Sequence, residues 1–258
     1  MMLAQMITPQ YSPDGRWYWD GERWLPVGPS PAVTPYRSPR TRSRWAVAML
    51  AVMAAVGALW LFAFGAEALL ATDHQYSDPS LYTTPMLLVT ALAFVLGIPT
   101  AAAVITWLFR CCRNLPALGV REIRRATPAE AIAGWFLPYV GTLFWPCLVV
   151  REAWLASDPA VPISTRTSRR GVPGVVLGWW IAYVAAVNLL SVGVYVAGSS
   201  TPRTATIGAL VGMLGVLAEV VAAGLAIAMV LGITSRQDAK SRALGLADAG
   251  EHRITEKW

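Results

Sequence analysis

Four polar side chains lie inside long apolar stretches of this chain and are the residues best placed to do chemistry. Glu219 falls near the midpoint of one stretch, whereas Asn188, Ser191 and Tyr195 follow one side of another at steps of three and four. An acid held away from water can relay protons or bind a cation, or it can hold two helices together by a hydrogen bond. Because Asn188 and Glu219 lie within about one helical turn of the same depth, we predict a hydrogen bond between them.

Both roles remain open for Glu219. Relays usually chain several ionisable groups, and no second acid, His or Lys lies beside Glu219 in the sequence, which favours the structural role.

The other reactive side chains form no pattern that indicates an enzyme. Cys111, Cys112 and Cys147 have the spacing of neither a disulfide framework nor a zinc site, so we expect reduced, structural thiols. His74 and His252 belong to no metal-binding spacing. A phosphate-binding glycine loop, a nucleophile elbow and a zinc-protease signature are all missing from the sequence. We therefore expect no metal, no cofactor and no catalysis.

The elements that must position the polar groups are long apolar stretches. The chain is 55% hydrophobic and only 14% charged, whereas a soluble domain carries about a quarter charged residues. A helix needs roughly 20 apolar residues to cross a hydrocarbon core of roughly 30 Å. The stretches that meet this length are 45–71, 86–109, 174–197 and 207–233. The sequence predicts an all-α integral membrane protein with four transmembrane helices.

Small residues indicate how the last two spans pack. The fourth span places Gly208, Gly212 and Gly215 on the same face as Glu219, and the third begins with Gly174 and Gly178. Small residues let membrane helices approach closely. We expect these spans to be antiparallel neighbours, joined by the short loop 198–206, with Glu219 facing into the bundle.

One further apolar stretch, "GWFLPYVGTLFWPCLVVRE" (134–152), is interrupted by Pro138, Gly141 and Pro146. Proline removes a backbone donor and clashes with the preceding turn, so each arm is too short to span. Residues 127–130, Thr-Pro-Ala-Glu, have the pattern of a helix start. We predict a re-entrant or interfacial helical element over 128–156, with a kinked ordinary span as the alternative.

The basic residues decide between these two topologies. Loops rich in Lys and Arg stay cytoplasmic. If the middle element returns to its own side, Arg203 alone of 21 basic residues lies outside, whereas nine lie outside if it crosses. The first arrangement predicts a multi-pass protein of the bacterial cytoplasmic (plasma) membrane with both termini cytoplasmic.

The net charge of +6 has a local explanation in the same arrangement. Arginines at the cytoplasmic face attract anionic lipid headgroups by about 1 kcal/mol each. We expect headgroup contacts and no nucleic-acid partner. The arginines concerned are Arg110, Arg113, Arg121, Arg124 and Arg125.

The N-terminal stretch "YSPDGRWYWDGERWLPV" (11–27) contains two Asp-Gly pairs, which favour tight hairpin turns. We predict a small β-hairpin in which Trp17, Trp19 and Trp24 pack together and bind a partner. This stretch resembles the tryptophan-rich "WDG" modules of domain of unknown function 2510, which implies an accessory interaction module.

The chain therefore divides into four predicted parts. A Trp-rich module (1–27) is followed by a proline-rich linker (28–44), the membrane domain (45–233) and a polar cytoplasmic tail (234–258).

Three segments of the central region carry a second resemblance. They are "WLFRCCRNLPALG" (107–119), "TPAEAIAGWFLP" (127–138) and "PCLVVREAWLASDP" (146–159). The pattern resembles the bacterial membrane family domain of unknown function 4328, over roughly residues 86–235. The resemblance implies an architecture and no activity, so it assigns no functional residue.

These observations favour a non-enzymatic scaffold or regulatory protein that presents its tryptophan module to a cytosolic partner. The first alternative is a small transporter or channel that uses Glu219 and Asn188. The least favoured is a membrane enzyme acting on lipids, because the basic loops lack a convergent acid, histidine or nucleophile. A second copy of the chain is a further candidate partner.

Overall fold

The computed structural model divides the chain into two units, Met1–Pro35 and Tyr36–Trp258. We describe each unit by itself. The described residues are 10–12, 17–19, 24–26, 35–72, 80–120, 123–136, 140–160, 171–197 and 202–246.

The first unit contains a three-stranded antiparallel sheet. Strand β1 (Gln10–Tyr11) pairs with β2 (Trp17–Trp19), and β2 pairs with β3 (Trp24–Pro26). Trp19 lies opposite Trp24 in the register, and their ring centroids are 5.7 Å apart. The sequence predicted two strands and missed β1, whereas both Asp-Gly pairs lie outside the described residues.

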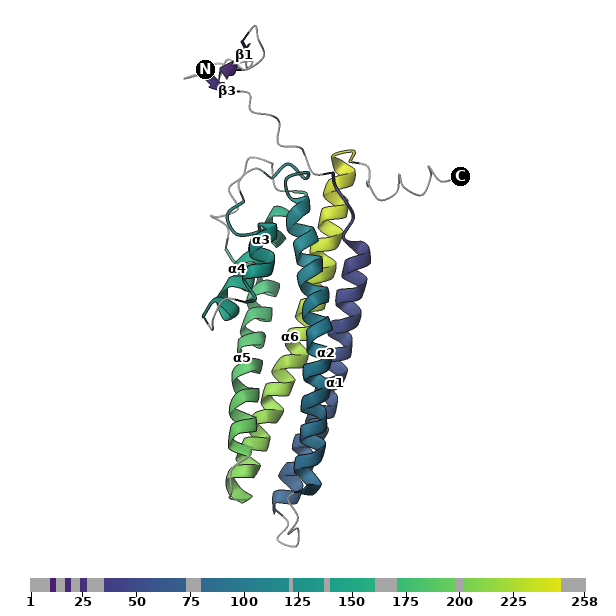
Figure 1. Cartoon of the computed structure of the whole chain (residues 1–258), viewed down its shortest axis with the longest axis vertical. Coiled ribbons are helices and arrows are strands. Elements are labelled where there is room, and N and C mark those ends of the chain that lie inside the picture. The colour runs from purple at the N-terminus through teal and green to yellow at the C-terminus, as the bar shows by residue number, and fades with distance from the viewer. Residues whose placement is uncertain are drawn as a thin grey trace, which may run out of the picture. The chain divides into compact units, whose positions relative to one another are not determined.

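The second unit is built on four long helices (Figure 1). They are α1 (Arg40–Thr72), α2 (Ser80–Asn114), α5 (Gly174–Ala197) and α6 (Pro202–Ala243). All four are long and apolar enough to cross a membrane. Large apolar side chains point outward from them, such as Phe62 and Phe94, which are 77% and 73% exposed. Such a surface is stable against lipid and not in water, so this is an all-α membrane protein with four spanning helices, as predicted.

The four helices follow one another around an open arc. Helix α5 packs on α6, α6 on α1, and α1 on α2, whereas α2 and α5 make no direct contact within the described part of the chain. The α5–α6 contact is close because Gly193 faces Gly212: a Cβ on Gly193 would lie 2.5 Å from the Gly212 Cα. On its other side Gly212 meets the Phe64 ring of α1. Glycines therefore let three helices approach at one level.

The remaining predicted packing glycines have different surroundings. A Cβ on Gly215 would lie 2.7 Å from the Leu190 backbone nitrogen, and the Gly208 carbonyl oxygen would lie 3.1 Å from a Cβ on Gly193. Gly178 lies at ordinary contact distance from Leu225, and Gly174 has no neighbour within 4 Å of such a Cβ. The close approach of α5 to α6 thus lies in the C-terminal half of α5, away from Gly174 and Gly178 at its start.

Two shorter helices, α3 (Pro128–Ala133) and α4 (Val140–Ala156), form the middle element. Thr127 caps α3 by accepting a hydrogen bond from the Glu130 backbone N–H at 3.1 Å, with Pro128 at the first helical position, as predicted. The element begins near the end of α2 and finishes beside the end of α6, where Lys240 donates to the Ala156 carbonyl at 2.9 Å. It therefore returns to the end of the bundle that it left and does not cross.

The predicted breaks in this element are only partly where the sequence placed them. Helix α4 continues through Pro146, which is buried, and Gly141 lies within its first turn, so neither residue interrupts the helix. Pro138 lies outside the described residues. A proline in the second turn of a helix displaces only one backbone hydrogen bond, and the packing around a buried ring can hold the helix together.

The boundary of the predicted tail is wrong. Helix α6 runs without interruption to Ala243, and its last turns are buried at the end of the bundle. The buried positions continue at helical spacing through Val230, Ile233, Thr234, Gln237, Asp238 and Ser241. Likewise α1 begins at Arg40, inside the predicted linker.

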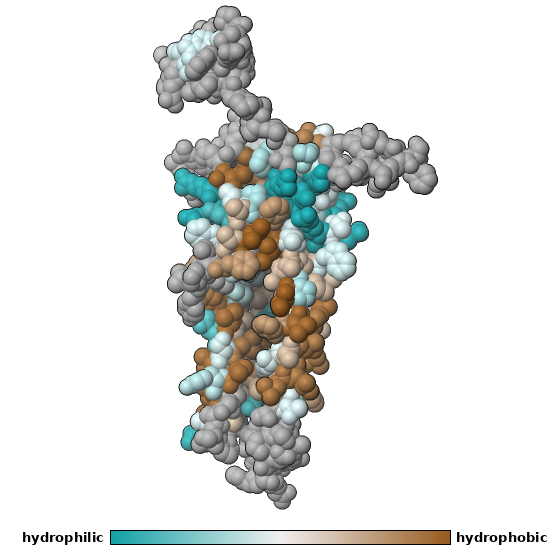
Figure 2. All heavy atoms as spheres, in the orientation of Figure 1, coloured by the Kyte–Doolittle hydropathy of each residue, from teal (hydrophilic) through white to brown (hydrophobic). Residues whose placement is uncertain are grey.

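Basic side chains gather at the end of the second unit where α1 begins and α2 and α6 finish. Figure 2 shows hydrophilic residues concentrated there, above a broad band of hydrophobic ones. Arg40, Arg113 and Arg242 lie at this end, whereas Arg203 lies at the start of α6, at the opposite end. We call it the basic end.

Candidate functional site

Two groups of polar side chains lie in the second unit, and they differ in burial and in how well their hydrogen bonds are satisfied. The first lies at the basic end and consists of Tyr36, Asn114, Ser157, Gln237 and Asp238, which we call the polar junction. The second surrounds Glu219 in the middle of the bundle.

Gln237 and Asn114 form the centre of the polar junction. The Asn114 amide donates to Gln237 Oε1 at 3.1 Å and to the Arg37 carbonyl at 2.8 Å. The Gln237 amide in turn donates to the Cys111 carbonyl at 3.0 Å and to Ser157 Oγ at 3.1 Å. Gln237 on α6 therefore joins α2 to the residue after α4, and Asn114 joins the same group to the segment before α1.

Asp238 attaches the beginning of the second unit to α6. Its carboxylate accepts hydrogen bonds from the Tyr36 hydroxyl at 2.6 Å, from Ser38 Oγ at 3.0 Å and from Arg40 Nε at 2.6 Å. Tyr36 and Asp238 are buried. A charged acceptor with three donors is a strong, directional anchor, so the first residues of the second unit are held against α6.

Glu152 on α4 has a similar role toward the loop before α3. Its carboxylate accepts from the backbone N–H groups of Arg124, Arg125 and Ala126, at 2.9, 2.5 and 2.7 Å. Successive backbone N–H groups form a concave site for an anion, and here the anion is a side chain of the same chain. Glu152 thus fixes the loop, and it leaves these N–H groups unavailable to a ligand.

The arginines predicted to contact lipid have several surroundings. Arg113, Arg124 and Arg125 are exposed, Arg110 is half-buried, and Arg121 lies outside the described residues. The Arg125 guanidinium lies over the Trp145 ring, 4.1 Å from its centroid. Exposure at the basic end is compatible with headgroup contact.

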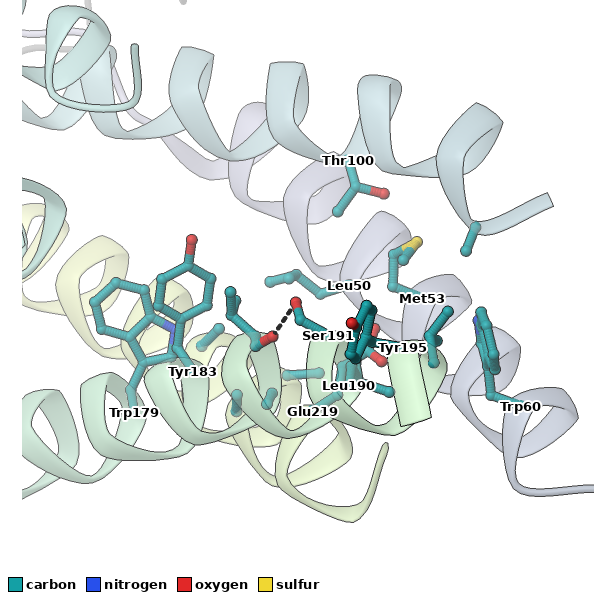
Figure 3. A pocket seen from close by; sticks show the side chains of 17 residues that line it. Leu50, Met53, Trp60, Thr100, Trp179, Tyr183, Leu190, Ser191, Tyr195 and Glu219 are labelled. Carbon is teal, nitrogen blue, oxygen red and sulfur yellow. Dashed lines mark hydrogen bonds between the residues drawn. The ribbon is translucent and has the colours of Figure 1, made fainter. Parts of the chain in front are cut away.

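The second polar group lines a cavity of about 730 Å³ enclosed by α1, α2, α5 and α6 (Figure 3). Helix α4 contacts both α2 and α5, whereas α2 and α5 make no direct contact with each other within the described residues, which leaves space for the cavity between them. Tyr195, on the α5 wall, is 85% exposed, so the cavity opens sideways between α2 and α5. In a bilayer this opening faces lipid.

The predicted hydrogen bond between Asn188 and Glu219 does not form. The Asn188 amide donates instead to the Val184 carbonyl of its own helix, at 2.7 Å, and Asn188 is absent from the cavity lining. Ser191 and Tyr195 do line the cavity together with Glu219. The rotation of α5 around its axis turns Asn188 away from the cavity.

The sequence reasoning missed the polar junction. The apolar stretch that predicts the fourth span ends at Ile233. The buried face of α6 continues beyond it with Thr234, Gln237, Asp238 and Ser241. These polar residues share a spacing of three and four with the apolar residues before them. That spacing could have predicted that the helix continues with the same face buried. Two residues of the polar junction, Asn114 and Ser157, lie in the segments 107–119 and 146–159 that carry the family resemblance.

Chemistry based on metals or thiols finds little support in the described part of the chain. No group of three or more His, Cys, Asp or Glu residues there could hold a metal ion. Cys111 and Cys112 are buried and unpaired, and Cys147 is half-buried and unpaired. Burial raises the pKa of the Cys147 thiol, which lowers its nucleophilicity at neutral pH.

Comparison with known proteins agrees with the resemblance of the central segments. No curated protein and no solved structure matches the chain. A family model matches residues 83–235, a region that runs from α2 to within the last turns of α6 and includes the middle element and Glu219. Because this match covers more than half of the 258 residues, the chain belongs to the family described as Domain of unknown function (DUF4328).

Proposed function

We propose that this protein is a non-enzymatic scaffold or regulatory protein that holds its tryptophan-rich N-terminal sheet at the membrane for a cytosolic protein partner. The observation that supports the proposal most directly is the attachment of Tyr36, Ser38 and Arg40 to Asp238 on α6. These bonds hold the first residues of the second unit against α6, so the segment that follows the N-terminal unit is anchored to the bundle.

The sheet has the surface expected of an interaction module. Trp24 is 45% exposed and lies next to Trp19, and exposed tryptophans are frequent binding hot spots. Trp17, Trp19 and Trp24 are the residues that we propose bind the partner. The likeness to the short "WDG" modules supports the same role.

The proposed location is the bacterial cytoplasmic membrane, with both termini in the cytoplasm. The gathering of Arg and Lys at the basic end supports this orientation, because such residues remain on the cytoplasmic side. Ala160→Cys, at the basic end, should react with an impermeant maleimide only from the cytoplasmic side. Labelling of intact cells at this position would contradict the orientation.

The partner proposal is tested with full-length protein in cells by cross-linking and quantitative mass spectrometry. We expect one cytosolic protein to be enriched with the wild type and lost with a Trp19→Ala/Trp24→Ala double variant. Trp45→Ala is the matched control, because Trp45 is an exposed tryptophan of α1, outside the sheet. The purified partner should bind the wild type and Trp45→Ala equally and the double variant much more weakly. An identical set of enriched proteins from the wild type and both variants would overturn the proposal.

The second candidate function is transport. The sideways-opening cavity around Glu219 supports it, whereas Asn188, the other residue proposed for a path, lies outside the lining. Vesicles containing the purified protein should then show a flux of small cations that is lost with Glu219→Gln. Equal leakage from wild-type and variant vesicles would exclude this function.

A further inference from the structure

The carboxyl group of Glu219 is the one acidic group that lines the cavity, and the described residues provide it with no partner. No hydrogen bond or ion pair links it to another described side chain, and no basic residue lines the cavity. The Ser191 and Thr100 hydroxyls add further acceptors, because they already donate to the carbonyls of Val187 and Leu96, each at 2.7 Å. The Tyr183 and Tyr195 hydroxyls also line the cavity. The cavity therefore offers a carboxylate and hydroxyl groups, and no basic side chain, to whatever enters it.

The rest of the lining is apolar and aromatic. Trp179 and Tyr183 stack on α5 with centroids 5.9 Å apart, and Trp60 contributes a third ring from α1 (Figure 3). Aromatic faces attract organic cations, most strongly where water is excluded. An ionised acid inside a membrane is stable when it is paired with a cation. An organic cation would pair with the Glu219 carboxylate and also contact the aromatic rings.

The size and opening of the cavity narrow this class further. A volume of about 730 Å³ lies within the range of sites for small organic molecules. Because the opening lies between α2 and α5, a ligand enters from the bilayer and must itself partition into lipid. An anionic lipid would bring a second negative charge toward Glu219.

We propose that this cavity binds an amphiphilic organic cation from the bilayer, with Glu219 paired to its charge and the aromatic side chains in contact with its apolar body. The site is separate from the N-terminal sheet and from the polar junction, so this inference goes beyond the proposed scaffold role. Binding does not require transport.

The test measures equilibrium binding of tritiated tetraphenylphosphonium to the full-length protein in phosphatidylcholine nanodiscs. We expect saturable binding that dodecylamine displaces at least ten times more effectively than dodecanol, whereas dodecanoate has no effect. The three competitors share one chain and differ in the charge of the head. Equal displacement by dodecylamine and dodecanol would show that apolar contact alone is responsible and would overturn the proposal.

Two variants and one control connect the binding to the cavity. Glu219→Gln should weaken tetraphenylphosphonium binding at least tenfold. Glu67→Gln should leave it unchanged, because Glu67 carries a carboxyl on a spanning helix, as Glu219 does, but lies outside the cavity. Ala93→Phe fills the cavity from α2 without altering any charge, and it should abolish binding even if Glu219→Gln does not fold. Wild-type affinity in Ala93→Phe, or no saturable binding to the wild type, would overturn the assignment.

Discussion

The polar junction and the cavity around Glu219 both contain polar side chains, but their burial and hydrogen bonding differ. The junction residues are buried, whereas Glu219 is half-buried. In the junction, Gln237 and Asn114 direct every side-chain amide group to a partner on another segment. In the cavity, the Ser191 and Thr100 hydroxyls donate within their own helices, and the Glu219 carboxyl has no partner among the described residues. A satisfied group stabilises the fold, whereas an unsatisfied one is available to a ligand.

The largest effect that tests this difference is expected at Gln237. Gln237→Leu would remove three buried hydrogen bonds, which join Gln237 to the Asn114 amide, the Cys111 carbonyl and Ser157 Oγ. Asn114 and Ser157 would each keep one partner, the carbonyls of Arg37 and Ala153. Each lost hydrogen bond costs about 1 kcal/mol, so we expect a loss of about 3 kcal/mol in the free energy of unfolding. Thermal unfolding in nanodiscs measures it, with the exposed Ser235→Ala on the same helix as control. Equal stability of both variants would show that the junction is dispensable.

A smaller loss is expected at Glu152. Glu152→Gln keeps the size of the side chain but replaces a charged acceptor of three backbone N–H groups by a neutral one. We expect a loss of about 2 kcal/mol, because hydrogen bonds to charged groups are the stronger ones. Limited proteolysis between α2 and α3 should become faster in the same variant. Unchanged cleavage there would mean that Glu152 does not fix this loop.

Glu219→Gln should change stability least of the three. No protein partner is lost, so we expect the free energy of unfolding to stay within about 0.5 kcal/mol of the wild type. The same unfolding experiment measures it without added cation. A loss comparable with that of Gln237→Leu would place Glu219 among the structural residues and remove the contrast between the two regions.

The smallest effect concerns Glu130, at the start of α3. Burial, together with the negative charge of Glu152, raises the pKa of its carboxyl above the ordinary value, against the opposing effect of Arg125. The folded state therefore favours the neutral acid, and stability falls as the pH rises from the ordinary carboxyl pKa through the raised one. Glu130→Gln should be slightly more stable than the wild type above this window and equal to it below. Unfolding temperatures measured across this pH range test the sign.

Much of the architecture could be predicted because it follows from local chemistry. The apolar length of each stretch predicts a spanning helix, and the Thr127 cap with Pro128 predicts where α3 begins. The uneven distribution of Arg and Lys predicted that the middle element would not cross, and α3 and α4 do return to the basic end. The predicted interruptions at Gly141 and Pro146 do not occur, because a helix held by tertiary packing tolerates both residues.

The sequence by itself determined the number of spanning helices and their order, because the hydrophobic effect and backbone hydrogen bonding act on each segment separately. Only the tertiary structure decided which polar groups meet. The rotation of α5 directs Asn188 to its own backbone, and the extension of α6 brings Gln237 to Asn114. Rotation and crossing of helices depend on close packing, such as that of Gly193 on Gly212. That packing depends on side chains from several segments at once, which the pattern of any one segment does not contain.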